Sequence, residues 1–324
     1  KMRKNIIESW ENSTAKKLGN ITYFPEISSK SGTEYFIEMF DREEMNVPFG
    51  FSRVIEEPVL DFSTPKFLFH DKYDKKLILE YATAPSTSKD MLVSWLDFTV
   101  DFLNKISLSS DDMEIEYRTL EQEPDSEHYF FDRFTIKNIY HFGLEEFAWV
   151  NNKIDFEFEN YDKNFPQDKK AKCFVHDDLR NIDYFPHVVQ ILIDVNKLIL
   201  AILLNNFHQE RVRTSIISTL KLSPQTAPVK CAVFPLSIVD KKTRLAGERL
   251  LALFNKSFET VLEEKGTLEM RIAMFNEIGV PFYVAIDPEL VDDNIFWLYD
   301  NSYGTRSEVS GDDIIEYINA KIKE

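Results

Sequence analysis

Two prolines interrupt the chain in the segment Leu222-Ser223-Pro224-Gln225-Thr226-Ala227-Pro228, and neither can continue a helix. After this break, short apolar runs alternate with helical patterns. The apolar runs predict strands at Val229–Leu236, Val280–Ile286, Asn294–Tyr299 and Arg306–Val309, and the helical patterns predict helices at Thr243–Glu264, at Thr267–Ile278 and after Ser310. This β-α-α-β-β-α pattern predicts a small parallel or mixed sheet with helices on its faces. We therefore place a domain boundary at the break, which gives residues 1–222 and 223–324.

The first 222 residues mix strand and helix patterns in a less regular order. We expect helices at Arg3–Lys17, Thr33–Glu44, Ser88–Ile106 and Asn196–Phe207, and strands at Ile21–Phe24, Val54–Leu60, Lys66–His70, Lys75–Tyr81, Cys173–His176 and Val188–Asp194. Three stretches have weaker patterns: Ser109–Asp125 is predicted as a surface excursion, Phe134–Val150 as a strand and a helix, and Asn151–Lys172 as a hairpin. The whole chain is therefore expected to be an α/β protein of the α+β kind.

The charge balance limits what the chain can bind. Its net charge is −17, and it has only 9 glycines. Proteins that grip nucleic acid are normally basic, because phosphate neutralisation supplies most of the affinity. We therefore expect weak direct binding to DNA or RNA, and a large basic partner as the natural complement. The few glycines argue against a fold built on Gly-rich phosphate loops.

Catalytic, metal and membrane signatures are weak. The two cysteines, Cys173 and Cys231, lie far apart in the sequence, and the group Cys173, His176, Asp177 and Asp178 has no second Cys/His pair that could complete a zinc site. We expect no metal and no cofactor. The apolar stretch Val188–Phe207 carries Asp194 and Lys197 near its centre, so we predict a buried strand and a core helix and no membrane contact.

Two short motifs give the last hundred residues a family resemblance. Ala227-Pro228-Val229-Lys230 opens the first strand, and Glu277-Ile278-Gly279-Val280-Pro281-Phe282 leads into the central one. These residues and their spacing resemble the anticodon-binding domain of the glycyl, prolyl, histidyl and threonyl tRNA synthetases. The resemblance implies that residues 223–324 form an anticodon-binding-like, mixed-sheet α/β domain.

Four further segments resemble, in the same order, accessory subunits of mitochondrial DNA polymerases. These segments are Met2-Arg3-Lys4-Asn5-Ile6, Trp95-Leu96-Asp97-Phe98, Leu198–Phe207 and Leu220-Lys221-Leu222-Ser223-Pro224. The resemblance covers nearly the whole chain and is thin between Asp111 and Lys172. It implies that residues 1–222 form a class II synthetase-like antiparallel sheet flanked by helices.

The synthetase chemistry needs arginines that these motifs lack. An active class II enzyme holds the ATP α-phosphate with a Phe-Arg-x-Glu motif and the γ-phosphate with a Gly-x-x-Arg motif, because a guanidinium binds phosphate in a bidentate manner. The corresponding stretches are Val54–Val59, which contains Glu56-Glu57, and Asp194-Val195-Asn196-Lys197, which has Asp and Lys at the Gly and Arg positions. We therefore expect that the chain is not an enzyme, has no catalytic residues and does not bind ATP.

The resemblance implies a processivity factor that binds the catalytic subunit of the mitochondrial DNA polymerase in the mitochondrial matrix (nucleoid) and strengthens its hold on primer–template DNA. It also implies docking through residues 229–324. The candidate contacts are an exposed edge and a neighbouring strand: Val233, Phe234, Leu236, Ile238, Asn294, Phe296 and Trp297. A basic cluster could add contact with a nucleic-acid backbone: Lys163, Lys169, Lys170 and Lys172. DNA would be reached mainly through the holoenzyme.

Two alternatives to the accessory role stay open: a divergent class II synthetase of the glycyl type, and a synthetase-like regulator that binds tRNA or another protein. For the accessory role we expect a monomer in a one-to-one heterodimer. Vertebrate members of that family dimerise through a long helical insertion, whereas the corresponding stretch here, Phe24–Phe49, has room for one short helix only.

Overall fold

The computed structural model of the chain describes residues 1–17, 21–23, 31–41, 47–58, 73–119, 130–164, 173–177, 180–212, 215–237 and 239–323. The chain divides into two compact units. The seven-stranded unit comprises Ile7–Asn104 and Ser109–Ala201. The five-stranded unit comprises Lys1–Ile6, Lys105–Leu108 and Ile202–Glu324. The expected domain boundary after Leu222 stays a prediction.

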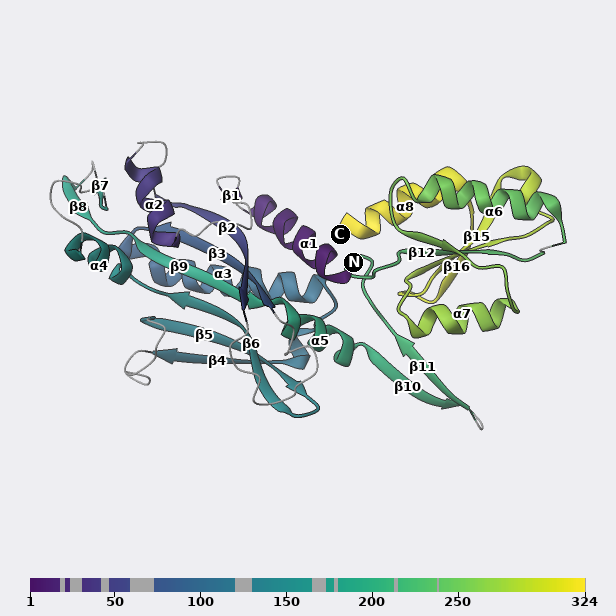
Figure 1. Ribbon diagram of the computed structural model, residues 1–324, viewed down its shortest axis with the longest axis horizontal. Helices are drawn as coiled ribbons and strands as arrows, with labels where there is room; N and C mark the ends of the chain where they lie inside the picture. The colour runs from purple at the N-terminus through teal and green to yellow at the C-terminus, as the bar shows by residue number, and fades with distance from the viewer. Residues whose placement is uncertain are drawn as a thin grey trace. The chain divides into compact units, whose positions relative to one another are not determined.

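The seven-stranded unit is built on one large sheet (Figure 1). Its strand order is β1-β2-β3-β9-β6-β5-β4, and every neighbouring pair is antiparallel except β1 with β2. The strands of this sheet are β1 (Ile21–Tyr23), β2 (Phe49–Pro58), β3 (Tyr73–Thr83), β4 (Met113–Thr119), β5 (Asp132–Tyr140), β6 (Gly143–Asn152) and β9 (His187–Asp194). A separate hairpin pairs β7 (Val175–Asp177) with β8 (Ile182–Tyr184).

Helices cover parts of both faces of this sheet. They are α1 (Met2–Lys17), α2 (Gly32–Asp41), α3 (Ser88–Lys105), α4 (Phe156–Asn164) and α5 (Val195–Asn205). Helix α3 packs on one face, where Trp95 makes an edge contact with Tyr81 of β3, and Trp10 of α1 adds to this layer. Helices α2 and α4 cover one end of the opposite face with an aromatic cluster: Phe36, Phe40, Phe49, Phe51 and Phe158.

The five-stranded unit contains a mixed sheet with strand order β13-β12-β14-β15-β16. Its strands are β12 (Cys231–Pro235), β13 (Thr260–Leu262), β14 (Phe282–Ile286), β15 (Ile295–Asp300) and β16 (Thr305–Ser310), and its helices are α6 (Lys241–Phe254), α7 (Leu268–Glu277) and α8 (Gly311–Lys323). Strand β12 is parallel to both neighbours, whereas β15 is antiparallel to both of its own. Helices α6 and α8 lie on one face and α7 on the other (Figure 1). The predicted mixed sheet with helices on its faces is therefore confirmed.

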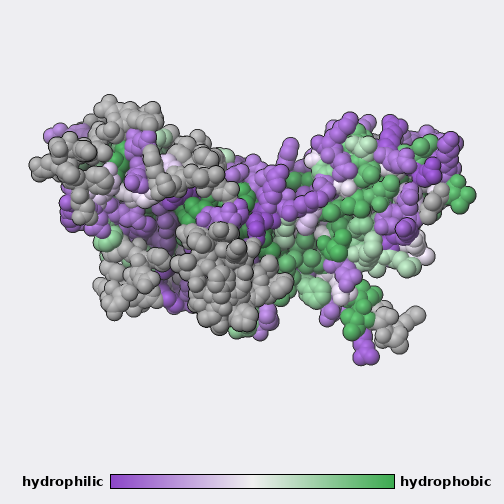
Figure 2. Space-filling view, viewed as in Figure 1, coloured by the Kyte–Doolittle hydropathy of each residue, from purple (hydrophilic) through white to green (hydrophobic). Residues whose placement is uncertain are grey.

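A hairpin precedes this sheet. It pairs β10 (Phe207–Val212) with β11 (Ser215–Leu220) and was not predicted. Phe207, Ile216 and Ile217 are exposed on it, and Figure 2 shows hydrophobic surface on this hairpin.

Four predicted elements are wrong. Ser109–Asp125 contains strand β4, where Met113, Ile115 and Tyr117 alternate with charged residues. Phe134–Val150 holds no helix, because it forms most of the antiparallel pair β5 and β6. Asn151–Lys172 contains helix α4 in place of a hairpin. The predicted helix Thr243–Glu264 stops at Phe254, and the chain then adds the parallel strand β13. The predicted strand Lys66–His70 lies outside the described residues.

The long apolar stretch Val188–Phe207 folds as predicted, into strand β9 and helix α5. No helix in the described part of the chain is long and apolar enough to cross a membrane.

Candidate functional site

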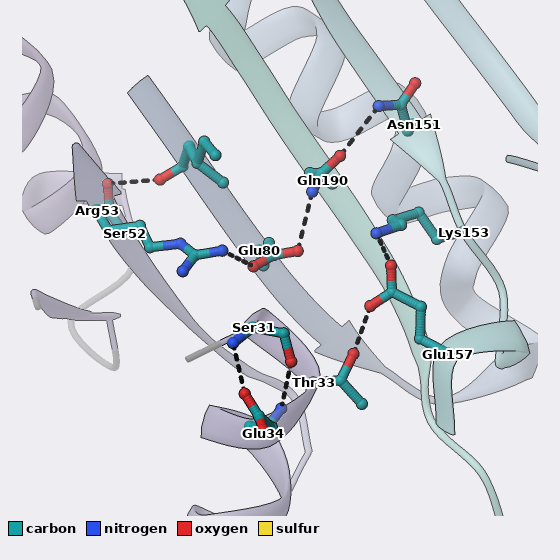
Figure 3. Close-up of polar contacts among 11 residues, drawn as sticks. Ser31, Thr33, Glu34, Ser52, Arg53, Glu80, Asn151, Lys153, Glu157 and Gln190 are labelled. Atoms are coloured by element: carbon teal, nitrogen blue, oxygen red, sulfur yellow. Dashed lines mark hydrogen bonds and ion pairs between the residues drawn. The ribbon is translucent and has the colours of Figure 1, made fainter. Parts of the chain in front are cut away.

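Five adjacent strands of the large sheet each place a polar side chain on the same face, and these side chains form a continuous row. Figure 3 shows its members Arg53, Glu80, Gln190 and Asn151. The Nη2 atom of Arg53, on β2, lies 3.5 Å from the Oε2 atom of Glu80, on β3. Gln190 Nε2 of β9 donates to Glu80 Oε1 at 2.9 Å, and Asn151 Nδ2 of β6 donates to Gln190 Oε1 at 3.2 Å. Arg133 Nε of β5 donates to Asn151 Oδ1 at 2.7 Å. We call these five residues the polar row.

Strand pairing explains why these residues meet. Glu80 is the register partner of Gln190, Gln190 is the partner of Asn151, and Asn151 is the partner of Arg133. Directly opposed residues of neighbouring strands point to the same face, so side chains far apart in the sequence form one line.

The carboxylate of Glu80 is the member of the row whose burial requires the most compensation. Its side chain is buried, with 2% of the residue exposed. Burying a carboxylate is costly unless opposite charge and hydrogen bonds compensate, and Arg53 and Gln190 supply part of that compensation. Within the described part of the chain, Glu80 Oε2 accepts no hydrogen bond. The nearest charged group to this oxygen among the described residues is the Arg53 guanidinium.

The beginning of helix α2 packs directly against this carboxylate. A Cβ added to Gly32 would lie 1.9 Å from Glu80 Oε2, so only glycine permits the approach. Ser31 caps the helix, since its Oγ accepts from the Glu34 N–H at 3.3 Å and its N–H donates to Glu34 Oε2 at 2.7 Å (Figure 3). The positive end of the α2 dipole therefore adds to the field that stabilises the Glu80 charge.

A second group of polar side chains lies beside the row (Figure 3). The ammonium of Lys153 forms an ion pair with Glu157 of α4, and the Thr33 hydroxyl donates to the other carboxylate oxygen of Glu157. Burial lowers the pKa of Lys153, Glu80 opposes this shift, and Arg53 adds to it. The charges of Glu80 and Arg53 therefore act on the Lys153 ammonium, which belongs to the same electrostatic site.

Charged residues continue along this face to the sheet edge at β4. Arg118 holds Glu116 with two hydrogen bonds, at 2.9 and 3.0 Å, and Lys137 forms an ion pair with the same carboxylate. These contacts, with the Arg118 hydrogen bond as the largest cause, lower the pKa of Glu116 to about 2. Trp149 Nε1 donates to Glu146 Oε2 at 2.9 Å, and Arg118 lies 3.7 Å from Glu146.

This arrangement can bind a small zwitterionic or phosphorylated ligand. A buried carboxylate binds an ammonium group, and guanidinium groups bind carboxylates and phosphates. No group of three His, Cys, Asp or Glu residues suited to a metal ion occurs in the described part of the chain. Sequence reasoning missed this row. Its signal was a polar residue within each apolar run: Glu80 in Leu77–Tyr81, and Gln190 in Val188–Leu192.

The residues expected to carry a polymerase contact lie differently from the prediction. The predicted exposed edge around Asn294-Ile295-Phe296-Trp297 is wrong, because β15 is an interior strand and the edges of the sheet are β13 and β16. Val233 and Phe234 are fully buried, and Phe296 belongs to the core. Leu236 is 37% exposed, and Asn294 is exposed in a left-handed conformation (φ 57°) before β15. Ile238 lies outside the described residues.

Trp297 is half-buried, and the guanidinium carbon of Arg306 lies 3.5 Å from the centroid of its ring. Of the four lysines in the expected basic cluster, Lys163 is at the end of α4, exposed and paired with Glu159 at 2.9 Å. Lys169, Lys170 and Lys172 lie outside the described residues. The polymerase and nucleic-acid contacts of these residues stay predictions.

The residues at the expected Gly-x-x-Arg position form a helix start. Asp194 Oδ1 accepts from the Lys197 N–H at 3.0 Å and so caps α5, and burial raises the pKa of Asp194. The Lys197 ammonium donates to the Glu146 carbonyl oxygen at 3.0 Å. In the stretch that corresponds to the Phe-Arg-x-Glu motif, Glu56 is exposed on β2 and lies 3.7 Å from the Lys75 ammonium. Val59, at the end of that stretch, lies outside the described residues.

An antiparallel sheet with a charged face, followed by a smaller mixed sheet with helices on both faces, is a class II synthetase-like fold, and the fold prediction is confirmed. No protein-family profile matches the chain. Its similarity is instead to individual curated proteins.

Curated proteins similar to the chain include glycine–tRNA ligases of bacteria. The chain is 25% identical to that of Caldanaerobacter subterraneus over 277 residues, which are 86% of this chain and 58% of the relative. It is 23% identical to that of Clostridium tetani over 280 residues, again 86% and 58%. It is 22% identical to that of Mycolicibacterium paratuberculosis over 327 residues, 93% of this chain and 68% of the relative. The chain therefore spans about 58% of the length of the first two of these relatives.

These relatives correct one expectation. The prediction that the chain is not an enzyme is contradicted, because the curated relatives are named as ligases. That prediction rested on two linear motifs. The sheet face instead carries guanidinium groups from separate strands, at Arg53, Arg118 and Arg133, which a search for one short motif does not find.

Proposed function

We propose that the chain is a synthetase-type ligase of the glycine–tRNA ligase kind, and that it binds a small amino acid and ATP on the face of the polar row. The observation that carries this proposal is the buried Glu80 carboxylate, with one oxygen that accepts no hydrogen bond from the described residues. The similarity to glycine–tRNA ligases over 86% of the chain supports the same assignment.

The charged groups of the amino acid and of ATP have suitable partners in this proposal. The ammonium of the amino acid would bind the Glu80 carboxylate, and Arg53 beside it would bind the amino-acid carboxylate or the α-phosphate. Arg133 at the other end of the row would bind a further phosphate. Helix α2 approaches Glu80 so closely at Gly32 that little room remains beside the carboxylate, and this favours an amino acid without a bulky side chain.

The proposed chemistry differs in one respect from the motif pattern of class II enzymes. Lys197 stands where an arginine is expected, and its ammonium is engaged by the Glu146 carbonyl. We propose that arginines on neighbouring strands take over the phosphate contacts, since a guanidinium acts through its geometry wherever the fold places it.

Glycine-dependent exchange of pyrophosphate into ATP tests this proposal. The chain should catalyse exchange with glycine and magnesium, and Glu80→Gln should lower the rate at least about 100-fold, because it removes the charge that holds the ammonium. The matched control is Glu308→Gln, an exposed position on β16 in the five-stranded unit, which should leave the rate unchanged. Absence of exchange above background in folded protein would refute the ligase proposal.

A second candidate is the role that the sequence resemblance implies, an accessory subunit that binds the catalytic subunit of the mitochondrial DNA polymerase. Two observations favour it. The net charge of −17 suits a basic protein partner. Lys197 stands where the class II motif has an arginine, and its ammonium is engaged by the Glu146 carbonyl. This candidate includes a one-to-one heterodimer, DNA contact mainly through the holoenzyme, and a place in the mitochondrial matrix. Co-purification of a stoichiometric polymerase chain with the tagged protein tests it, and recovery of the protein alone would contradict it.

A further inference from the structure

A cavity of about 210 Å³ lies in the five-stranded unit, between the edge strand β16 and helix α8. Strand β16 contributes three alternate residues to its wall, Thr305, Ser307 and Val309, and α8 contributes Asp313 and Tyr317, which are about one turn apart. We call it the edge cavity. Its volume is below the range of small-molecule sites, about 300–1,000 Å³, and suits a single side chain.

Strand pairing explains why the cavity opens at this edge. Thr305 is the register partner of Asp300, and Ser307 is the partner of Leu298, so these four side chains share one face of the sheet. Leu298 is buried in the core beneath α8, whereas Thr305 and Ser307 are exposed. Helix α8 therefore covers β15 on this face and leaves the outer strand open.

Strand β16 is the longer of the two edges of this sheet. It has six residues, against three in β13, and among the described residues it pairs with β15 alone. An edge strand presents the backbone N–H and C=O groups of its outer side to a further strand. The first four residues of β16, from Thr305 to Glu308, are exposed, so an extended peptide can reach this edge.

Two carboxylates give the edge cavity a negative charge. Asp313 is exposed at the start of α8, where its Oδ2 accepts from the Ser310 hydroxyl at 2.8 Å. The Tyr317 hydroxyl of α8 donates to Asp300 Oδ2 at 2.6 Å, which places the buried Asp300 carboxylate between the sheet and the helix. Asp300 Oδ1 accepts from the Ser302 N–H at 2.9 Å. A carboxylate has about four acceptor sites, so Asp300 can accept a further donor.

The surroundings of the cavity favour a basic occupant. No lysine, arginine or histidine occurs among the described residues that line it. Lys321, about two turns along α8 from Asp313, holds its ammonium 5.2 Å from the centroid of the Tyr303 ring and 5.9 Å from that of Tyr317. Exposed carboxylates elsewhere on α8, at Asp312 and Glu316, add to the negative charge, and the chain as a whole has a net charge of −17.

We propose that an extended basic peptide adds to β16 as a further strand of the sheet and places a basic side chain in the edge cavity. Backbone hydrogen bonds to β16 hold the strand, and the carboxylates of Asp300 and Asp313 select the positive charge. The aliphatic stem of that side chain packs beside Leu298 and Val309. This site lies in the five-stranded unit and does not depend on the proposed ligase activity.

Fluorescence anisotropy with the labelled peptide Ser-Val-Thr-Lys-Thr-Val-Ser, its termini blocked, tests the proposal on the full chain. Its β-branched residues favour a strand, and its single lysine limits the general attraction to an acidic protein. We expect a dissociation constant in the micromolar range. Replacement of the lysine by norleucine, which keeps the stem, should weaken binding at least about tenfold, because charged hydrogen bonds are lost.

Asp313→Asn should weaken binding of this peptide about fivefold or more, because it removes the exposed charge at the cavity. The matched control is Asp312→Asn, which removes the same charge from the neighbouring exposed residue, outside the cavity lining, and should bind like the wild type. Both residues lie in the first turn of α8, so the effect on the helix dipole is shared. Equal loss in the two variants would overturn the proposal, since net charge alone would then explain the affinity.

Hydrogen–deuterium exchange, measured by mass spectrometry, shows where the peptide binds. Strand addition should slow the exchange of backbone amides in β16 and leave β13, at the other edge, unchanged. Peptide binding without slower exchange in β16 would refute strand addition, and absence of binding to the folded chain at millimolar peptide would refute the site itself. A chain that is dimeric in light scattering, with β16 protected before peptide is added, would contradict the proposal as well, because a second copy would then occupy the edge.

Discussion

Replacement of Gly32 by alanine perturbs the polar row without removing any of its polar atoms. The new Cβ would lie 1.9 Å from Glu80 Oε2, 2.5 Å from Cδ and 2.8 Å from Oε1. An ordinary contact begins near 3.4 Å, so the carboxylate or helix α2 must move by about 1.5 Å. The carboxylate is held by Gln190 at 2.9 Å and by Arg53 at 3.5 Å, and a shift of that size breaks both contacts.

The cost follows from those contacts. Overpacking in a well-packed site costs about 1–3 kcal/mol, and loss of a charged hydrogen bond costs about 1.5–3 kcal/mol, while alanine returns up to about 1 kcal/mol through its higher helix propensity. We expect Gly32→Ala to destabilise the chain by about 2–4 kcal/mol and to lower its melting temperature by about 5–10 °C. Under the ligase proposal, glycine-dependent pyrophosphate exchange should fall at least about tenfold at a temperature where the variant is folded.

Ser31→Ala is the control for this experiment. It removes the cap of α2, which costs about 1 kcal/mol, but leaves Glu80 and its partners in place. Thermal unfolding followed by circular dichroism, together with the exchange assay, measures both variants. If Gly32→Ala melts like the wild type and exchanges at the wild-type rate, helix α2 does not press on Glu80 and the reasoning about the size of the site is wrong.

Three further predictions concern stability. Phe36→Ala should destabilise the chain by about 3–5 kcal/mol in urea unfolding, because Phe36 lies at the centre of the aromatic cluster under α2. Arg271→Met should cost about 2–4 kcal/mol, since the buried guanidinium donates to two backbone carbonyls at 2.9 Å; an unchanged urea midpoint would contradict this. Burial and the hydrogen bond to Asp300 raise the pKa of Tyr317 to about 12, so its stabilising effect is complete below pH 10 and is lost as the pH rises through 12. Tyr317→Phe should therefore be less stable than the wild type at pH 8, and the difference should shrink above pH 11.

The sequence predicted correctly those helices whose apolar stripe and end signals all lie within one continuous segment. Helix α3 has a buried apolar stripe, and the final helix starts where Ser310 accepts from the Asp313 N–H. Gly279, which directly follows the predicted helix Thr267–Ile278, has the positive φ that is common just after the end of a helix. Strand β4 was missed because it lies at a sheet edge, where Ile115 and Tyr117 are exposed and the acidic neighbours dominate the composition.

The candidate site could not be predicted in the same way. Arg53, Glu80, Arg133, Asn151 and Gln190 come from five strands, and only the sheet order β2-β3-β9-β6-β5 makes them neighbours. Strand order depends on pairings between distant segments, which local periodicity does not encode. The same limit explains the wrong edge prediction, because the alternation in β15 does not reveal that this strand is interior.

Binding of a non-hydrolysable glycyl-adenylate analogue, measured by isothermal titration calorimetry, tests the role of the polar row most directly, because it requires no turnover. The account predicts one site with a dissociation constant in the micromolar range or below, and a loss of at least about tenfold in Glu80→Gln, where the ammonium of the analogue loses its charged partner. Glu308→Gln should bind like the wild type. No detectable binding to the folded wild-type chain, or equal affinity in Glu80→Gln, would contradict the assignment of this sheet face as the amino-acid site.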